Sequence, residues 1–236
     1  MIKAIVFDAY GTLFDVYSIS SLAERLYPGH GAAISTLWRD KQIEYTRLIS
    51  LSDPTATADG AGSRYYQSFW DITRLSLAYT LSRLKLDASP ETEAALMQQY
   101  AKLSPFPENI GVLQALKSMG MATAILSNGS REMLDSAVAS AGMKDLLNHV
   151  ISVDDVKQFK TSPASYALVG KYFPVPANEI LFVSSNAWDA LGATWFGFAT
   201  LWVNRQGLPG EAIGPAPTYI GADLTQVLRV LPQNAS

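Results

Sequence analysis

The sequence predicts an α/β protein: a doubly wound, Rossmann-like parallel sheet with an inserted helical cap subdomain. From about residue 104 onward, short apolar runs alternate with helical patterns, which is typical of parallel strands joined by helices. Between the first strand and this region, about 90 residues have helical periodicity without a strand pattern. We therefore place the catalytic core at residues 1–14 and 104–236 and the cap at residues 15–103.

The composition is that of a globular protein. The chain has 236 residues, 48% of them hydrophobic and 17% charged, which is enough to bury a sizeable core. Its net charge of −3 and its lack of a Lys/Arg run argue against a nucleic-acid partner. The absence of Cys excludes disulfides, thiolate metal sites and a Cys nucleophile. We see no signal peptide and no membrane-spanning run, so we expect a cytoplasmic protein without a membrane partner.

The first strand delivers a carboxylate to the edge of the sheet. Residues 2–7 are apolar and rich in β-branched side chains, as in a strand buried on both faces of a parallel sheet. The strand ends at Asp8, and open α/β sheets bind ligands at this edge. Gly11 then permits a sharp turn, and Thr12 places a hydroxyl four residues after the carboxylate. The alternative is an ordinary strand that ends in an exposed Asp.

Helical periodicity dominates the next segment of the chain. Four helices are expected, over residues 16–26, 32–51, 64–86 and 90–103. The second has an apolar stripe made of Ile34, Leu37, Trp38, Tyr45, Leu48 and Ile49. Residues 52–62 contain Pro and two Gly and have no periodicity, so we expect a loop there. Ser89 is placed to cap the fourth helix.

The second half of the chain alternates between the two patterns. Strands are expected over residues 122–126, 149–153, 180–183 and 199–203, with a further edge strand near 218–220. Helices are expected over residues 108–119, 131–141, 163–173, 187–196 and 223–231. The two histidines, His30 and His149, have no metal-like spacing, and we expect both at the surface.

Polar residues follow each strand that we expect at the centre of the sheet. They are Asp8, Ser127, Asn128, Ser184 and Asn186, with Lys160 in the segment after the strand at 149–153. Because parallel strands end at the same edge, we expect these side chains to converge on one crevice.

These residues belong to four motifs that resemble the ordered motifs of the haloacid dehalogenase superfamily. They are Asp-Ala-Tyr-Gly-Thr-Leu-Phe-Asp at 8–15, Leu-Ser-Asn-Gly at 126–129, Lys160, and Phe-Val-Ser-Ser-Asn-Ala-Trp-Asp at 182–189. Most members of the superfamily are phosphatases with a second Asp two residues after the nucleophile, as general acid and magnesium neighbour. Tyr10 occupies that position here, which removes the proton donor that a phosphate ester's leaving group needs.

Tyr10, the tract at 182–189 and Leu-Trp-Arg at 37–39 are similar to the L-2-haloacid dehalogenases, and the similarity covers nearly the whole chain. The resemblance implies hydrolysis of short L-2-haloalkanoic acids to D-2-hydroxy acids through an ester on Asp8, without metal or cofactor. It implies a halogenated carboxylate and halide as ligands, and a homodimer. Whether haloacetates and fluoroacetate are substrates is open.

The sequence departs from that family at three places. Asp40 stands beside the cap arginine where Gln is common, and Thr161-Ser162 follow Lys160 where Pro and a polar residue are usual. The loop at 52–62 resembles an insertion. The first departure leaves substrate preference open, because a carboxylate then lies beside an expected anion site.

The resemblance also implies a role for each site residue. Asp8 is the implied nucleophile, Lys160 the cation that keeps it ionised, and Arg39 the halide acceptor. Asp189 is the implied base or water orienter, and Tyr166 the brace of Lys160. The implied catalytic residues are Asp8, Thr12, Arg39, Ser127, Asn128, Lys160, Tyr166, Ser184, Asn186 and Asp189. The implied substrate-binding residues are Tyr10, Arg39, Ile43, Phe69, Ser127, Asn128, Lys160 and Trp188.

Two other functions stay open from the residues alone. One is a magnesium-dependent phosphatase of the same superfamily, and the other is a catalytically silent protein that binds a partner through its aromatic cap. Without the resemblance, Arg39 is an ordinary solvated helix charge. Tyr10, Ile43, Phe69 and Trp188 are then equally well explained as core residues.

Overall fold

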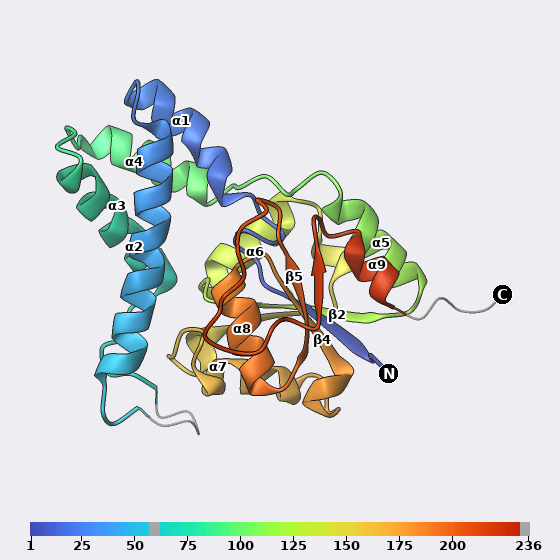
Figure 1. Ribbon diagram of the computed structural model, residues 1–236. Coiled ribbons are helices and arrows are strands. Elements are labelled where there is room, and N and C mark those ends of the chain that lie inside the picture. The colour runs from blue at the N-terminus through green and yellow to red at the C-terminus, as the bar shows by residue number, and fades with distance from the viewer. Residues whose placement is uncertain (57–61, 232–236) are drawn as a thin grey trace.

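A computed structural model describes residues 1–56 and 62–231 and confirms the predicted fold class (Figure 1). Six parallel strands form one sheet in the order β3-β2-β1-β4-β5-β6. The strands are β1 (Ala4–Phe7), β2 (Ala122–Ser127), β3 (His149–Ser152), β4 (Ile180–Ser184), β5 (Ala199–Val203) and β6 (Tyr219–Gly221). The edge strand expected near residue 218 is therefore present as β6.

The centre of the sheet determines where a ligand can bind. β1 is fully buried and lies between β2 and β4, with Ala4 in register with Ala122 and with Ile180. From β1 the chain builds β2 and β3 on one side and then β4, β5 and β6 on the other. Such a reversal of strand order opens a crevice beyond the carboxyl ends of the two strands where it occurs. Here those strands are β1 and β4, which end beside Asp8 and Ser184.

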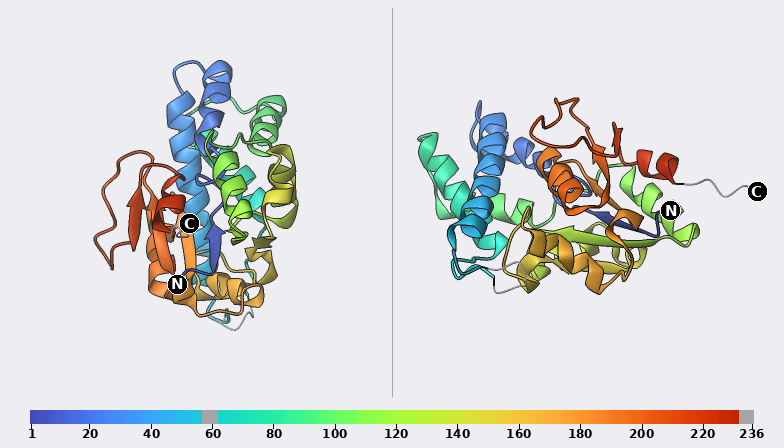
Figure 2. Two further views of the ribbon diagram at one scale, coloured as in Figure 1. Left: turned by 90° about the vertical axis from the view of Figure 1, so that its right-hand side faces the viewer. Right: turned by 60° about the horizontal axis from the view of Figure 1, so that its bottom comes forward.

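Helices cover both faces of the sheet (Figure 2). They are α5 (Asn109–Ser118), α6 (Arg131–Ser140), α7 (Pro163–Ala167), α8 (Ala187–Phe196) and α9 (Gln226–Val230). α5 packs against α9, and α7 packs against α8.

The inserted helices form a separate layer beside the sheet (Figure 1). They are α1 (Ile19–Leu26), α2 (Gly31–Ser52), α3 (Phe69–Arg83) and α4 (Pro90–Tyr100). α2 is the longest of these four helices and packs against both α1 and α3. The two chain segments that join this layer to the sheet run together, because Phe14 forms an antiparallel bridge with Pro105 and the Asp15 N–H donates to the Ser104 carbonyl at 2.9 Å.

Two predictions for the inserted helices are wrong. The helix expected from residue 64 begins at Phe69, because the Ser68 hydroxyl accepts the Asp71 N–H and caps the helix there. In α2, Leu48 is 53% exposed, whereas Gln42 is buried and donates to the Thr73 hydroxyl at 3.1 Å. Apolar spacing therefore predicted the wrong residue on one side of the stripe. The Gln42 amide can occupy a buried position because it is hydrogen-bonded.

Other predicted bounds need smaller corrections. Ser89 caps α4 as expected, because its hydroxyl accepts the Thr92 N–H at 3.2 Å. The helix expected over 163–173 is α for only five residues and then continues as a 3-10 helix. The last helix is also shorter than expected, and residues 57–61 and 232–236 of the predicted loop and C-terminus lie outside the described residues.

Both histidines are partly exposed, and His149 also makes aromatic contacts. Its ring packs against Tyr172 and Phe173, with centroid distances of 4.9 and 5.4 Å, and it is half-buried. His30 is also half-buried, directly before α2.

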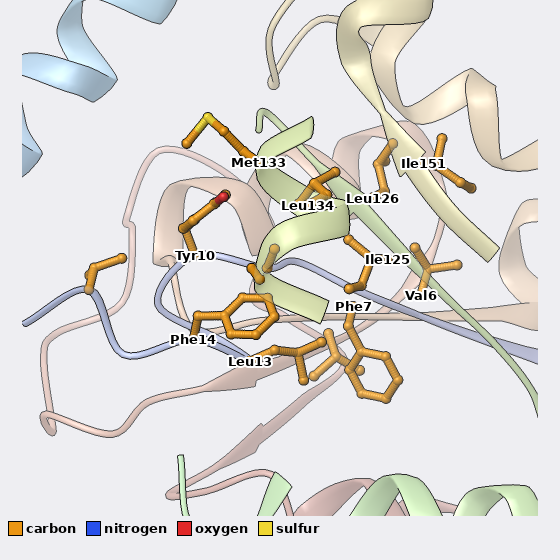
Figure 3. Close-up of a cluster of buried hydrophobic side chains, with 14 of the residues drawn as sticks. Val6, Phe7, Tyr10, Leu13, Phe14, Ile125, Leu126, Met133, Leu134 and Ile151 are labelled. Atoms are coloured by element: carbon orange, nitrogen blue, oxygen red, sulfur yellow. The ribbon is translucent and has the colours of Figure 1, made fainter. Parts of the chain in front are cut away.

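Tyr10 belongs to the buried hydrophobic cluster between β1, β2 and α6 (Figure 3). Figure 3 shows its ring on the side of Met133 and Leu134. Gly129, after β2, leaves room for this ring, since an added Cβ would lie 2.7 Å from Tyr10 Cε2. The tyrosine next to the Asp8 loop is therefore a packed side chain.

We predict that Gly129→Ala lowers the free energy of unfolding by about 1–3 kcal/mol, because the new methyl displaces Tyr10 in a packed core. Urea unfolding checks this. Gly111→Ala in α5 is the matched control: nothing lies within 4 Å of the added Cβ, so stability should stay unchanged or rise by up to about 1 kcal/mol. Equal stability of Gly129→Ala and the wild type would contradict the packing role.

Candidate active site

The Asp8 carboxylate is held by three side chains from three parts of the chain. Lys160 Nζ donates to Oδ1 at 3.0 Å. Thr12 Oγ1 and Asn186 Nδ2 donate to Oδ2 at 3.1 and 2.8 Å. Only 6% of the residue is exposed, and its own N–H donates to the Val183 carbonyl at 2.9 Å, which fixes it against β4. Asp8 is thus an oriented carboxylate with little contact with solvent.

The direction of the Thr12 hydrogen bond follows from its neighbours. Gly11 adopts φ +95°, and this left-handed turn brings the threonine back over Asp8. Thr12 Oγ1 accepts the Ser185 N–H at 2.8 Å, so its own proton is directed to the carboxylate. The loop after β4 therefore orients a donor that belongs to the loop after β1.

Lys160 is fully buried between two carboxylates. Its Nζ lies 3.0 Å from Asp8 Oδ1 and 2.9 Å from Asp189 Oδ2, and 4.9 Å from the Phe182 ring centroid. Burial lowers the pKa of this ammonium, but Asp189 and Asp8 together raise it by more, so the pKa stays above its ordinary value of 10.5. The group is a permanent cation at neutral pH.

Asp189 is fully buried on the other side of the lysine. Burial raises the pKa of its carboxyl, Asp8 adds to this effect and Lys160 opposes it, so the net direction is upward. Tyr166 donates to Asp189 Oδ1 at 2.8 Å, and burial and the Asp189 charge raise the pKa of the phenol, which stays protonated. The prediction that Tyr166 braces Lys160 is corrected: its hydroxyl bonds Asp189, because α7 and α8 pack together at this point.

Arg39 reaches the same crevice from α2. Its Nη2 donates to the Tyr10 carbonyl at 3.1 Å and to Asn186 Oδ1 at 3.3 Å, and its Nη1 donates to Gln42 Oε1 at 3.4 Å. Asn186 thereby accepts from the arginine and donates to Asp8, which fixes the orientation of its amide. Among the described residues, no carboxylate forms an ion pair with Arg39, so its charge is available to an anion.

Three further predicted residues shape the loops at the strand ends. Ser127 Oγ accepts the Gly129 N–H at 3.0 Å, and Ser184 Oγ accepts the Asn186 N–H at 3.1 Å. Asn128 Oδ1 accepts the Lys160 N–H at 2.9 Å. Within the described part of the chain, the Asn128 NH2 has no hydrogen-bond partner and can donate to a ligand.

The predicted pocket walls divide into two groups. Ile43 and Trp188 line an open cleft of about 840 Å³ that also reaches Arg39 and Asn186. Phe69 does not line this cleft: its ring packs against that of Tyr10, with centroids 5.8 Å apart. Burial and, as the second cause, the nearby Tyr100 raise the pKa of the Tyr10 phenol, which therefore stays neutral.

Sequence reasoning missed three residues around this site. Gln42 holds Arg39, and Tyr100 donates to Gln42 Oε1 at 3.3 Å while stacking on Tyr10 at 5.7 Å. Arg47 stands over the Trp188 ring at 5.5 Å, where it bridges α2 and α8. The spacing of three residues between Arg39 and Gln42 was a usable signal, because residues three apart share a helix face. Nothing local indicated Tyr100.

The described residues contain no group of three or more His, Asp or Glu side chains that could hold a metal ion. The position between the Asp8 and Asp189 carboxylates holds the Lys160 ammonium.

Comparison with known proteins gives consistent matches. The family model for haloacid dehalogenase-like hydrolases matches residues 2–197. The haloacetate dehalogenase H-2 of Moraxella sp. (strain B) is 41% identical over 218 residues, which cover 92% of each chain. A crystal structure of an L-2-haloacid dehalogenase has 54% identity, 97% coverage of both chains and a TM-score of 0.92. The L-2-haloacid dehalogenase of Xanthobacter autotrophicus, solved with chloropropionic acid covalently bound, is 38% identical, covers 98% of this chain and 100% of its own, and has a TM-score of 0.85.

We predict that Lys160→Met lowers the free energy of unfolding by about 3–5 kcal/mol at pH 8, because two buried carboxylates lose their cation. The pKa of the Asp189 carboxyl is raised in the folded state. Such a carboxyl lowers the free energy of unfolding once the pH exceeds its pKa in the unfolded chain, and its protonation at low pH removes this loss. The deficit should therefore narrow as the pH falls toward 5.

Urea unfolding of the wild type and Lys160→Met from pH 5 to pH 8 measures this difference. Lys171→Met, which removes an exposed lysine, is the control and should leave stability unchanged at each pH. A deficit that stays constant with pH would show that Lys160 does not neutralise the carboxylates.

Proposed function

The chain belongs to the haloacid dehalogenase-like hydrolases, and from this membership we propose that Asp8 is the nucleophile that displaces halide from L-2-haloacids. The reaction is hydrolytic cleavage of a carbon–halogen bond. The observation that best supports this role for Asp8 is its buried carboxylate, held by Lys160, Thr12 and Asn186 at the end of the central strand. An ionised carboxylate with little solvation is a strong nucleophile, because no water shell has to be removed before it reacts.

In the first step, an Asp8 oxygen attacks the α-carbon of the substrate opposite the halogen. A carbon–oxygen bond forms, the carbon–halogen bond breaks, and the halide leaves with the bonding pair. Attack from behind inverts the centre, so an L-2-haloacid gives a D-configured ester. The X. autotrophicus relative, with chloropropionic acid covalently bound, supports such an ester.

The departing halide and the substrate carboxylate each need a partner. We assign the halide to Arg39, helped by Asn128 and Trp188. The Arg39 guanidinium lines the cleft and forms no ion pair with a carboxylate of the described residues. We assign the substrate carboxylate to Ser127 and nearby backbone N–H groups at the end of β2. Ile43 and Trp188 line the cleft next to these groups, and Lys160 supplies a positive charge beside Asp8.

In the second step, water attacks the carboxyl carbon of the Asp8 ester. Asp189 is the proposed base, and its raised pKa favours proton uptake at higher pH than an ordinary carboxyl. Thr12, Asn186 and Lys160 already donate to the Asp8 oxygens and would hold the developing oxyanion, with Ser184 and Tyr166 supporting this geometry. The carbon–oxygen bond of the acyl group breaks, Asp8 is regenerated, and a D-2-hydroxy acid leaves.

We extend the proposal to haloacetates, including fluoroacetate as the hardest case. The relative from Moraxella is named a haloacetate dehalogenase, and haloacetates present the same α-carbon with less crowding. Asp40 lines the cleft beside Arg39, so we expect substitutions of Asp40 to change the preference among these substrates.

The remaining proposals concern location and assembly. We propose a cytoplasmic homodimer in which residues 15–103 act as the cap over the core. The cysteine-free composition and the apolar side chains exposed along the cleft, such as Leu48 and Leu208, support this arrangement. None of the helices in the described residues is long and apolar enough to cross a membrane.

We predict chloride release from L-2-chloropropionate, but not from its D enantiomer, in the presence of a chelator. The physical reason is that fixed partners for the substrate carboxylate and the halide allow Asp8 to attack opposite the halogen in one enantiomer alone. A chelator should have no effect, because the Lys160 ammonium supplies the positive charge beside Asp8. Ion chromatography of chloride and chiral analysis of the lactate product are the measurements.

Asp8→Asn should abolish release, and the matched control Asp135→Asn, an exposed carboxylate on α6, should retain it. Turnover of a generic phosphate ester that needs magnesium, without chloride release, would support the phosphatase instead. Unchanged turnover in Asp8→Asn would favour the partner-binding protein.

A further inference from the structure

Lys160 lies on an irregular segment, so its position depends on contacts outside regular secondary structure. Residues 153–162 join β3 to α7 without a strand, and Lys157 has a positive φ of 51°. Within the core, the Lys160 N–H donates to Asn128 and the Ser165 hydroxyl donates to the Gln158 carbonyl at 2.6 Å. These bonds hold one side of the segment.

The inserted helical layer holds the other side. The Phe159 N–H donates to the Ser50 hydroxyl at 2.8 Å, directly before Lys160. The Ser63 N–H donates to the Lys157 carbonyl at 3.0 Å. The Tyr66 hydroxyl donates to Asp154 in a short hydrogen bond. Three hydrogen bonds thus join residues 50–66 to the segment that carries the lysine.

Aromatic packing reinforces the same contact. The Tyr66 ring stacks on Phe159, with centroids 4.9 Å apart and planes inclined by 28°. Phe159 is fully buried and also lies 6.3 Å from Phe69, whose ring packs against Tyr10. The residue before the catalytic lysine is therefore fixed between the inserted layer and the core.

The Tyr66 hydroxyl is a dependable donor in this position. Burial, followed by the hydrogen bond to Asp154, raises its pKa far above the ordinary tyrosine value, so it stays protonated. The other Asp154 oxygen accepts the Arg131 N–H at 3.1 Å, at the start of α6. Asp154 therefore joins Tyr66 to a helix of the core.

We propose that Tyr66 and Ser50 are positioning residues for the dehalogenation: they hold the 153–162 segment so that Lys160 meets Asp8 when the inserted helices are docked. Neither residue touches the reacting atoms. The contacts that dock the inserted helices on the core then also place Lys160 beside Asp8, so both happen together. This inference rests on the proposed function of Asp8 and Lys160.

The test is Tyr66→Phe, which removes the hydroxyl and keeps the stacking ring. With L-2-chloropropionate we expect kcat to fall about tenfold, because the segment loses an anchor and holds Lys160 less precisely beside Asp8. KM should change less than twofold. The acid limb of the kcat profile should move to higher pH, because Asp189 loses part of its contact with the ammonium that lowers its pKa.

The matched control is Tyr65→Phe. This neighbouring tyrosine is 47% exposed, and among the described residues its hydroxyl bonds Arg64 alone, so kcat and the pH profile should stay as in the wild type. Ser50→Ala provides a second variant with the same expected direction, and Ser52→Ala, an exposed serine on the same helix, is its control. Thermal unfolding verifies that each variant is folded.

The possible outcomes separate the two proposals. Absence of chloride release in the wild type would contradict the proposed function itself. An active wild type with unchanged kcat and pH profile in both Tyr66→Phe and Ser50→Ala would overturn the positioning role. Equal losses in Tyr66→Phe and Tyr65→Phe would also overturn it, since they would reflect a general effect on the loop.

Discussion

A single ammonium between two buried carboxylates holds this molecule's crevice together. Two unit charges about 4 Å apart attract by about 4 kcal/mol at an effective dielectric near 20, and Lys160 has two such partners. For the lysine this attraction exceeds the cost of burial, so it stays charged; for Asp189 burial prevails and proton uptake becomes easier. The arrangement therefore contains a fixed cation, an oriented carboxylate at Asp8 and, at Asp189, a carboxyl suited to accept a proton.

The fold brings these groups together from distant parts of the chain. β1 delivers Asp8, the segment after β3 delivers Lys160, and α8 delivers Asp189, all at one edge of the sheet. Arg39 arrives from the inserted layer and contacts the loop after β1 through the Tyr10 carbonyl. The crevice is thus incomplete without the inserted helices, which supply the Arg39 guanidinium and also, in our proposal, position the lysine.

Sequence patterns predicted the strands and the polar residues that follow them, because both can be recognised from local periodicity. They did not reveal that Tyr166 bonds Asp189, that Phe69 packs on Tyr10 away from the cleft, or that Gln42 replaces Leu48 in the buried stripe. These contacts depend on how separate helices pack. The role of Tyr66 was invisible for the same reason, since Asp154 lies 88 residues further along the chain.

In the proposed reaction, Asp8 forms an ester whose own carboxyl carbon is attacked by water. A single turnover of L-2-chloropropionate with excess enzyme in ¹⁸O water, followed by mass spectrometry of the peptide that contains Asp8, tests this step most directly. We expect one heavy oxygen in the Asp8 carboxylate and unlabelled lactate from that first turnover. Label in the lactate with none in the protein would mean that water attacks the substrate directly, and would contradict an ester on Asp8.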